Sequence, residues 1–144
     1  MDTFLEPAHQ ALQRQVRSQL KDLDPPAQGD ESAATLARTL AALGLYRHLV
    51  PVAYGGVPER FDVRALCVLR EELAYRHPGL DAVYAVQGLG SYPVLLAGQE
   101  EQRRDLLGRV AQGTALFGFA LTESEAGSDV AAWRPSPGAT ATAM

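Results

Sequence analysis

Residues 80–98 read LDAVYAVQGLGSYPVLLAG, and apolar side chains fall on every side of a helix built from them. A helix that is hydrophobic all round is typical of the centre of a bundle, where each of its sides contacts another helix. Gly88, Gly90 and Pro93 interrupt the run, so we expect this helix to be kinked or broken near Ser91. The segment therefore predicts a helical bundle with this helix in the middle.

The flanking sequence supplies the helices that would surround it. An amphipathic stripe runs through residues 5–23 and is ended by the prolines of DPPAQGD. A second helix has Ser32 as its N-cap and Gly44 as its C-terminal stop. A third begins at Asp62 and ends near His77, because a Pro-Gly pair follows. The last, in QEEQRRDLLGRVAQG, has acids in its first turn and a late arginine, as the helix macrodipole favours. We predict an all-α fold, a bundle of about five helices.

The hydrophobic period changes after this bundle. The run TALFGFAL, residues 114–121, is short, apolar and aromatic, and it predicts a β-strand that leaves the helical domain. The final PSPGATATAM has no periodicity and predicts a disordered tail. We expect a helical domain over residues 1–113, the first strand and loop of a β-domain over 114–130, and a tail over 131–144. A lone strand needs partner strands, so we expect this β-domain to be truncated.

Composition excludes several classes of function. The 144 residues carry 13 basic and 17 acidic side chains without a basic block, which argues against nucleic-acid binding. No segment approaches the roughly 18 uninterrupted apolar residues of a membrane span, and the N-terminus lacks an apolar leader, so we expect a cytoplasmic protein. Cys67 lies in the apolar run RALCVLR and is expected to be a buried hydrophobic residue. His9, His48 and His77 are far apart in sequence, so no metal site is predicted.

The polar loop TESEAGSD, residues 122–129, follows the predicted strand directly. Thr122, Ser124 and Ser128 offer hydroxyls, and the backbone N–H groups of Ala126-Gly127-Ser128 can turn toward one point, as in sites that receive phosphate oxygens. A Gly-Ser-Asp sequence is also typical of an ordinary turn. The spacing alone leaves both interpretations open.

Five motifs in order give the chain a family resemblance. They are Leu-Gly-Leu at 43–45, P-x-x-Y-G-G at 51–56, E-E-L-A at 71–74, G-x-x-E-Q at 98–102 and L-T-E-x-x-A-G-S-D at 121–129. From about Leu36 to Asp129 the sequence resembles the N-terminal half of the acyl-CoA dehydrogenase family. The resemblance implies FAD-dependent α,β-dehydrogenation of an acyl-CoA thioester.

The resemblance also implies site residues. It assigns contact with FAD to Phe119, Leu121, Thr122, Gly127 and Ser128, with Ser128 also expected to contact the acyl-CoA substrate. Many members of the family have Pro-Gly where this chain has Ser-Glu at 124–125, which is a mild departure.

The catalytic base of the family comes from a C-terminal helical domain, and nothing after residue 129 matches that domain. We therefore expect no catalytic residue in this chain. Glu71 and Glu72 are expected on a solvated helix face, and Glu100 and Glu101 in the first turn of a helix. By its residues, the chain alone should be unable to catalyse the reaction.

Two other sets of observations leave alternatives open. Tyr84, Gln87 and Tyr92 lie where the family lines its acyl pocket, yet core packing explains them equally well. The chain is interpreted either as a truncated dehydrogenase, as one subunit of a split flavoenzyme whose partner chain supplies the missing domains, or as a non-catalytic helical interaction module. If the helix over residues 83–96 normally packs against absent domains, an apolar patch should be exposed and drive self-association.

Overall fold

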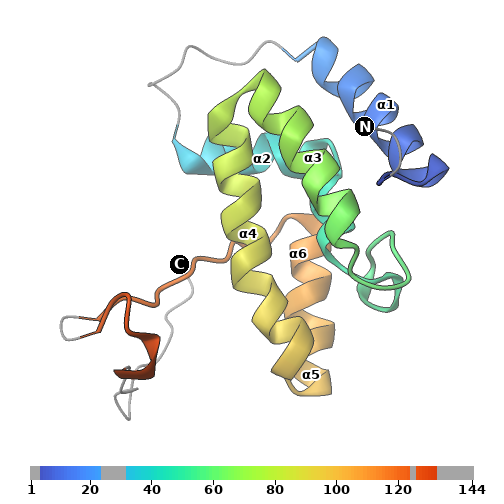
Figure 1. The fold of residues 1–144 in the computed structure, drawn as a ribbon. Helices are drawn as coiled ribbons and strands as arrows, with labels where there is room; N and C mark the ends of the chain where they lie inside the picture. The colour runs from blue at the N-terminus through green and yellow to red at the C-terminus, as the bar shows by residue number, and fades with distance from the viewer. Residues whose placement is uncertain (1–3, 24–31, 124–125, 133–144) are drawn as a thin grey trace.

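The computed structural model describes residues 4–23, 32–123 and 126–132, and within them the all-α prediction is confirmed. Four helices precede a helical run near the C-terminus (Figure 1). The four are α1 (Pro7–Lys21), α2 (Ala33–Ala42), α3 (Val63–Arg76) and α4 (Pro78–Ala97). The run consists of α5 (Glu100–Gln102), a π-helical turn (Arg103–Leu107) and α6 (Gly108–Gln112). Short 3-10 turns occur at Leu45–Leu49, Val52–Tyr54 and Val130–Ala132.

The predicted helix ends are confirmed where local chemistry fixes them. The Ser32 hydroxyl accepts from the backbone N–H of Thr35, and the Asp62 carboxylate accepts from the first backbone N–H groups of α3. Gly44 has a φ of 68° after α2, as its place in the sequence predicts. These caps set the lengths of the helices that build the core.

The core lies where α2, α3, α4 and the 45–49 turn meet. Its members are almost all aliphatic, and two tyrosines are stacked among them: the rings of Tyr46 and Tyr84 lie 6.2 Å apart between centroids, with 2° between their planes. Both side chains are fully buried, and burial raises the pKa of Tyr46 to about 12. Tyr84 is thus a core residue, as one of the two interpretations held.

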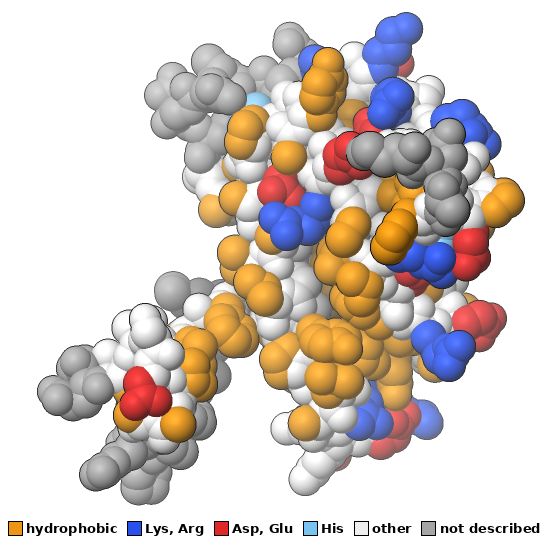
Figure 2. All heavy atoms as spheres, viewed as in Figure 1, with side chains coloured by type: hydrophobic (Ala, Val, Ile, Leu, Met, Phe, Trp, Pro, Cys, Tyr) orange, Lys and Arg blue, Asp and Glu red, His pale blue; other side chains and the backbone are white. Residues whose placement is uncertain are grey.

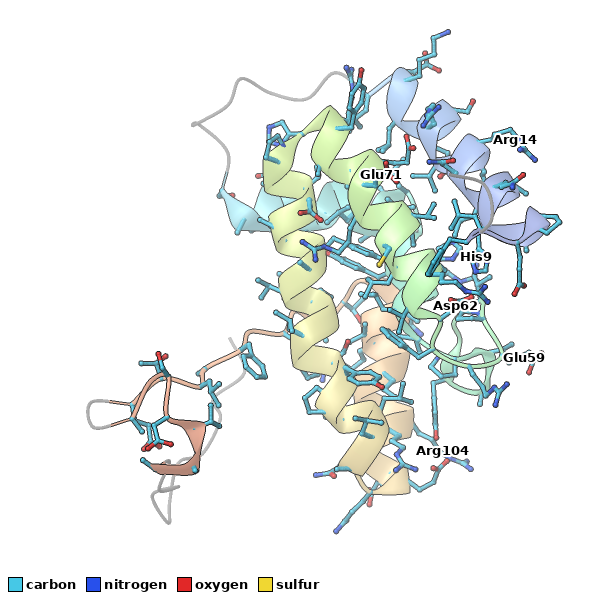
Figure 3. The ribbon with its side chains drawn as sticks, in the orientation of Figure 1. His9, Arg14, Glu59, Asp62, Glu71 and Arg104 are labelled. Atoms are coloured by element: carbon cyan, nitrogen blue, oxygen red, sulfur yellow. The ribbon has the colours of Figure 1, made fainter. Side chains whose placement is uncertain are left out.

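Hydrogen bonds and ion pairs connect helix α1 to α3 and its N-cap. The Arg17 guanidinium donates to both carboxylate oxygens of Glu72, at 2.9 and 2.6 Å, and His9 Nε2 donates to Asp62 Oδ2 at 2.9 Å. Figure 3 shows His9 and Asp62 pointing toward one another from the two elements. Glu72 is only 5% exposed, so its predicted place on a solvated face is wrong. Cys67 is exposed rather than buried, which is a second correction, because the residues one turn away on its side of α3, Arg64, Arg70 and Glu71, are exposed as well.

Helix α4 is continuous to Ala97, so the expected break near Ser91 is absent. Pro93 cannot donate a hydrogen bond to the turn before it, but packing against α2, α3 and the π-helical turn over Arg103–Leu107 stabilises the helix. The Ser91 hydroxyl donates to the carbonyl of Gln87 at 2.8 Å. One face of α4 is exposed, contrary to a helix buried on all sides, and it carries Val86, Leu89, Tyr92 and Leu96.

The predicted strand over residues 114–121 is also wrong: in the described part of the chain this segment is irregular. A strand needs a neighbouring strand to complete its hydrogen bonds, and none of the described residues provides one. Residues 133–144, most of the predicted tail, lie outside the described residues.

Candidate functional site

The segment that follows α6, residues 114–121, leaves the bundle across α4 and is called the exit segment. Gly113 ends α6 with a φ of 71°, and a Cβ added there would lie 2.3 Å from the Cβ of Ala41 in α2. Thr114 N then donates to Arg109 O at 2.9 Å, and the chain turns toward α4. Figure 1 shows the segment passing α4 before it reaches the loop and the C-terminal turn.

Gln87 holds the segment where it meets α4. Its Nε2 donates to the carbonyl of Ala115 at 2.8 Å, and its Oε1 accepts from the backbone N–H of Phe117 at 2.8 Å. The side chain is 1% exposed, so both bonds form away from water. The two bonds meet the consecutive peptide groups on either side of Leu116, which favours an extended backbone there.

Gly90, one turn along α4, lets the segment approach closely. A Cβ added at Gly90 would lie 2.5 Å from the Cβ of Phe117 and 3.0 Å from the carbonyl oxygen of Gly118. Real Cβ atoms do not come so close, so this crossing requires glycine. Gln87 and Gly90 thus fix both the direction of the segment and its distance from the helix.

An apolar cleft of about 400 Å³ lies between α3 and α4 at this crossing. Its walls include Phe61, Leu66, Gly88, Leu89, Tyr92 and Phe119. The rings of Phe61 and Tyr92 contact each other at 4.7 Å between centroids. Arg70 borders the cleft, and its guanidinium is held by two bonds to Asp81, at 2.8 and 3.0 Å. The cleft can take an apolar group but places no free carboxylate beside it.

The five residues predicted to contact a cofactor are all exposed but do not form one pocket. Phe119 is 51% exposed and lines the α3–α4 cleft, whereas Leu121 is 37% exposed beyond it. Thr122 and Gly127 lie together, since a Cβ added at Gly127 would be 3.8 Å from the Thr122 methyl carbon. Ser128 is exposed beside Gly127.

The loop around these residues closes on itself. Glu123 N donates to Ala126 O at 2.8 Å, and Ala126 is buried. Ser124, which the sequence analysis included among the hydroxyl donors, lies outside the described residues. The backbone of residues 118–122 makes no hydrogen bond with another described residue. Its N–H and C=O groups are therefore available to a partner or ligand.

Sequence reasoning missed the role of Gln87. The sequence predicted for Gln87 only a place in an acyl pocket or in the core. In the structure its amide is bonded to the exit segment. The available signal was a lone amide on an apolar helix, because a buried amide must find hydrogen-bond partners. Gly90 was interpreted only as a helix interruption, although a glycine within a helix also permits a close backbone approach.

Several acidic side chains of the bundle are bonded to basic side chains. Arg17 holds the pKa of Glu72 below its usual value through the hydrogen bonds between them. Burial acts in the opposite direction at Asp62, yet the hydrogen bonds from His9 and two backbone N–H groups lower its pKa. Glu100 bonds to Arg104 at 2.9 Å and accepts from the Tyr54 hydroxyl at 3.1 Å. Figure 3 shows Arg104 at the end of the bundle away from His9.

The described ranges hold neither a metal-ligand cluster nor a membrane-spanning helix. Within residues 4–23, 32–123 and 126–132, no group of three or more metal-ligating side chains gathers. In the same ranges no helix has the length and hydropathy needed to cross a membrane.

The sequence is similar to a known family profile and to known proteins. The sequence profile described as the acyl-CoA dehydrogenase N-terminal domain matches residues 2–114. The chain is 35% identical over 118 residues to the probable acyl-CoA dehydrogenase FadE25 of Mycobacterium tuberculosis, covering 79% of this chain and 30% of that protein. It is 28% identical over 129 residues to cyclohexane-1-carbonyl-CoA dehydrogenase of Geobacter metallireducens, covering 90% of this chain and 33% of that protein.

A solved structure shares the same fold. The crystal structure of an acyl-CoA dehydrogenase complexed with FAD from Bacillus anthracis superposes with a TM-score of 0.74 at 24% identity, over 90% of this chain and 23% of that one. The chain thus spans about a third or less of the length of the relatives it matches. Since the profile covers most of the sequence, the chain belongs to the acyl-CoA dehydrogenase family, and residues 2–114 are its N-terminal domain.

Proposed function

We propose that this chain provides the N-terminal part of an FAD-dependent acyl-CoA dehydrogenase, in which Phe119, Leu121, Thr122, Gly127 and Ser128 face the flavin. The observation that carries the proposal is the exit segment, which Gln87 holds against α4 so that Phe119 borders an apolar cleft. The relatives named above are acyl-CoA dehydrogenases, and the solved neighbour is complexed with FAD. By its share of their length, this chain supplies one part of such an enzyme.

The exposed segment fits one side of a flavin. Phe119 and Leu121 offer apolar surface, and the unbonded backbone groups at 121–122 offer a donor and an acceptor to the polar edge of the ring. The Thr122 and Ser128 hydroxyls and the exposed Gly127 suit phosphate oxygens. No described cavity encloses all five, so other polypeptide has to complete the site.

In this assignment the chain binds and orients rather than transfers protons. The bound flavin would supply the acceptor for the hydride that leaves the acyl β-carbon. The α3–α4 cleft would receive an apolar part of the substrate or cofactor and exclude water from it. The general base would be supplied by a segment outside the residues of this domain.

The test is the visible absorbance of the purified chain, first alone and then mixed with the complementing C-terminal portion of the M. tuberculosis relative. The expected result is a colourless chain that gains a stoichiometric flavin spectrum with FAD and the complement. Phe119→Ala should weaken FAD binding by about tenfold. The matched control is Phe4→Ala, since Phe4 is 82% exposed at the other end of the molecule and should leave binding unchanged. Absence of a flavin spectrum in the complemented mixture would contradict the proposal.

A second candidate function is that of a non-catalytic helical interaction module. The exposed apolar face of α4 favours it, because such a face suits a protein partner whether or not a flavin is present. A complemented complex that forms at one-to-one stoichiometry but remains colourless would favour the module over the enzyme.

A further inference from the structure

Gln87 makes an unusual polar contact for the middle of an apolar helix. Its neighbours in the groove beside it are Ala33, Ala82, Val83, Val86, Leu116 and Phe117, none of which titrates. Both ends of its amide are used, one on Ala115 O and one on Phe117 N. A buried amide that bonds only to backbone of another segment fixes where that segment lies.

The pattern of these bonds is that of a neighbouring β-strand. In an extended chain the carbonyl of one residue and the N–H of the residue two further on point to the same side, where the next strand would bond to them. A primary amide offers one donor and one acceptor side by side and can meet both. A carboxylate offers only acceptors, and an aliphatic side chain offers neither.

The two hydrogen bonds from Gln87 to Ala115 O and Phe117 N form a clamp. This clamp is also the last polar attachment of the segment to the bundle. Past Phe117, the described backbone makes no further bond until Glu123 N meets Ala126 O within the loop itself. Phe119 follows the clamp by two residues, and Gly90 keeps the segment close to α4 at the same point. The direction in which residues 118–123 extend is therefore set at Gln87.

We propose that Gln87 is a positioning residue that substitutes for a partner strand and presents Phe119, Leu121 and Thr122 to the cofactor. This inference rests on the proposed function for the presentation of those residues to a flavin, whereas the clamp itself can be measured without one.

The clamp is tested by amide hydrogen exchange in the 144-residue chain. In Gln87→Leu the protection factor of the Phe117 amide should fall by about tenfold or more, because its buried acceptor is gone. The control is Val68→Ala, which removes buried volume from α3 and lowers global stability without touching the segment. Amides of α4 serve as the internal reference for global unfolding in both variants.

Gln87→Glu adds a readout that loss of stability alone would not give. At neutral pH the introduced carboxylate has no proton to donate to Ala115 O and repels that carbonyl oxygen, so the segment should move off α4 and the Phe117 amide should lose its acceptor. Burial raises the pKa of such a group, so its protonated form, which can donate again, is populated below that raised pKa. Relative to wild type at the same pH, protection at Phe117 should be lost at about pH 7 and recovered near pH 5.

A measurement of FAD binding distinguishes failure of the proposed function from failure of the positioning role of Gln87. With the complementing polypeptide, Gln87→Leu should weaken FAD binding by about tenfold, while Val68→Ala should not. If the wild-type mixture binds no FAD, the proposed function fails and the exchange data still decide the clamp. If Phe117 exchanges equally in wild type and in both Gln87 variants, the positioning role is overturned. Should Gln87→Leu not fold, Gln87→Glu decides alone.

Discussion

Gly90 controls how closely the exit segment can approach α4. Alanine is ordinarily favoured over glycine within a helix by about 1 kcal/mol. At Gly90, however, the added methyl group would lie 2.5 Å from the Cβ of Phe117, so the segment would have to move. Gly108 offers the contrast, because it lies in the last helical run with nothing within 4 Å of an added Cβ.

We expect opposite effects from these two substitutions. Gly108→Ala should raise the free energy of unfolding by about 0.5–1 kcal/mol, as helix propensity alone dictates. Gly90→Ala should lower it by about 1 kcal/mol, because steric overlap outweighs propensity. Urea unfolding followed by circular dichroism measures both. A Gly90→Ala protein as stable as Gly108→Ala would mean that the segment does not pack on α4 as described.

Residue by residue, the sequence predicted what depends on near neighbours in the chain. Ser32, Gly44 and Asp62 were placed correctly because caps are set by residues within one turn. Glu72 was misplaced because its burial depends on Arg17, which lies 55 positions away. Gln87 was left ambiguous for the same reason, since its partners lie 28 and 30 positions away.

At the scale of elements, periodicity predicted the main helices correctly, but the strand that it predicted over residues 114–121 is absent from the described structure. A helix completes its hydrogen bonds within itself, whereas residues 114–121 require a second strand to do so. The helix was expected to be kinked or broken near Ser91, and the break is absent because α4 continues through Pro93 to Ala97. Neighbouring helices stabilise it there by packing, which a local pattern does not contain.

The α1–α3 contact predicts a pH dependence. Arg17 lowers the pKa of Glu72, so this pair stabilises the fold above the ordinary carboxyl pKa of 4.5 and loses its contribution as the pH falls through the lowered value. Glu72→Gln should reduce the free energy of unfolding at pH 7 by about 1.5 kcal/mol and flatten its acid dependence. Urea titrations from pH 7 to about pH 3 measure this. Its exposed neighbour provides the control, as Glu71→Gln should change little; equal effects at the two positions would refute the buried pair.

Two prolines of α4 should respond differently to replacement. Pro93→Ala restores a backbone donor inside the helix and should stabilise the chain by roughly 1–3 kcal/mol. Pro78 occupies the first position of the helix, where no donor is needed, so Pro78→Ala should be nearly neutral. Thermal unfolding of the two variants tests the difference. No gain from Pro93→Ala would show that Pro93 stabilises the cleft by as much as it weakens the helix.

The described helices form a bundle in which one apolar face stays exposed. Figure 2 shows hydrophobic side chains gathered over α4 and over the segment that leaves it. The exposed members on α4 are Val86, Leu89, Tyr92 and Leu96, and those on the segment are Leu116, Phe119 and Leu121. Neither length nor composition predicts which side is left open. The apolar sequence of α4 indicated more apolar surface than this bundle covers. Only together with the family resemblance did it predict that this side is left open.

This face should make the isolated chain associate with itself. Contiguous apolar surface is unfavourable in water, so contact between two copies or with a complementing polypeptide should remove it. Sedimentation velocity should show an average coefficient that rises with protein concentration, and the double variant Leu89→Lys with Leu96→Lys should suppress the rise. Val63→Lys is the control, because Val63 is 60% exposed at the start of α3, outside this face. A wild-type chain that stays monomeric at all concentrations would contradict the prediction. The same double variant should also weaken binding to the complementing polypeptide, because self-association and complementation would compete for one face.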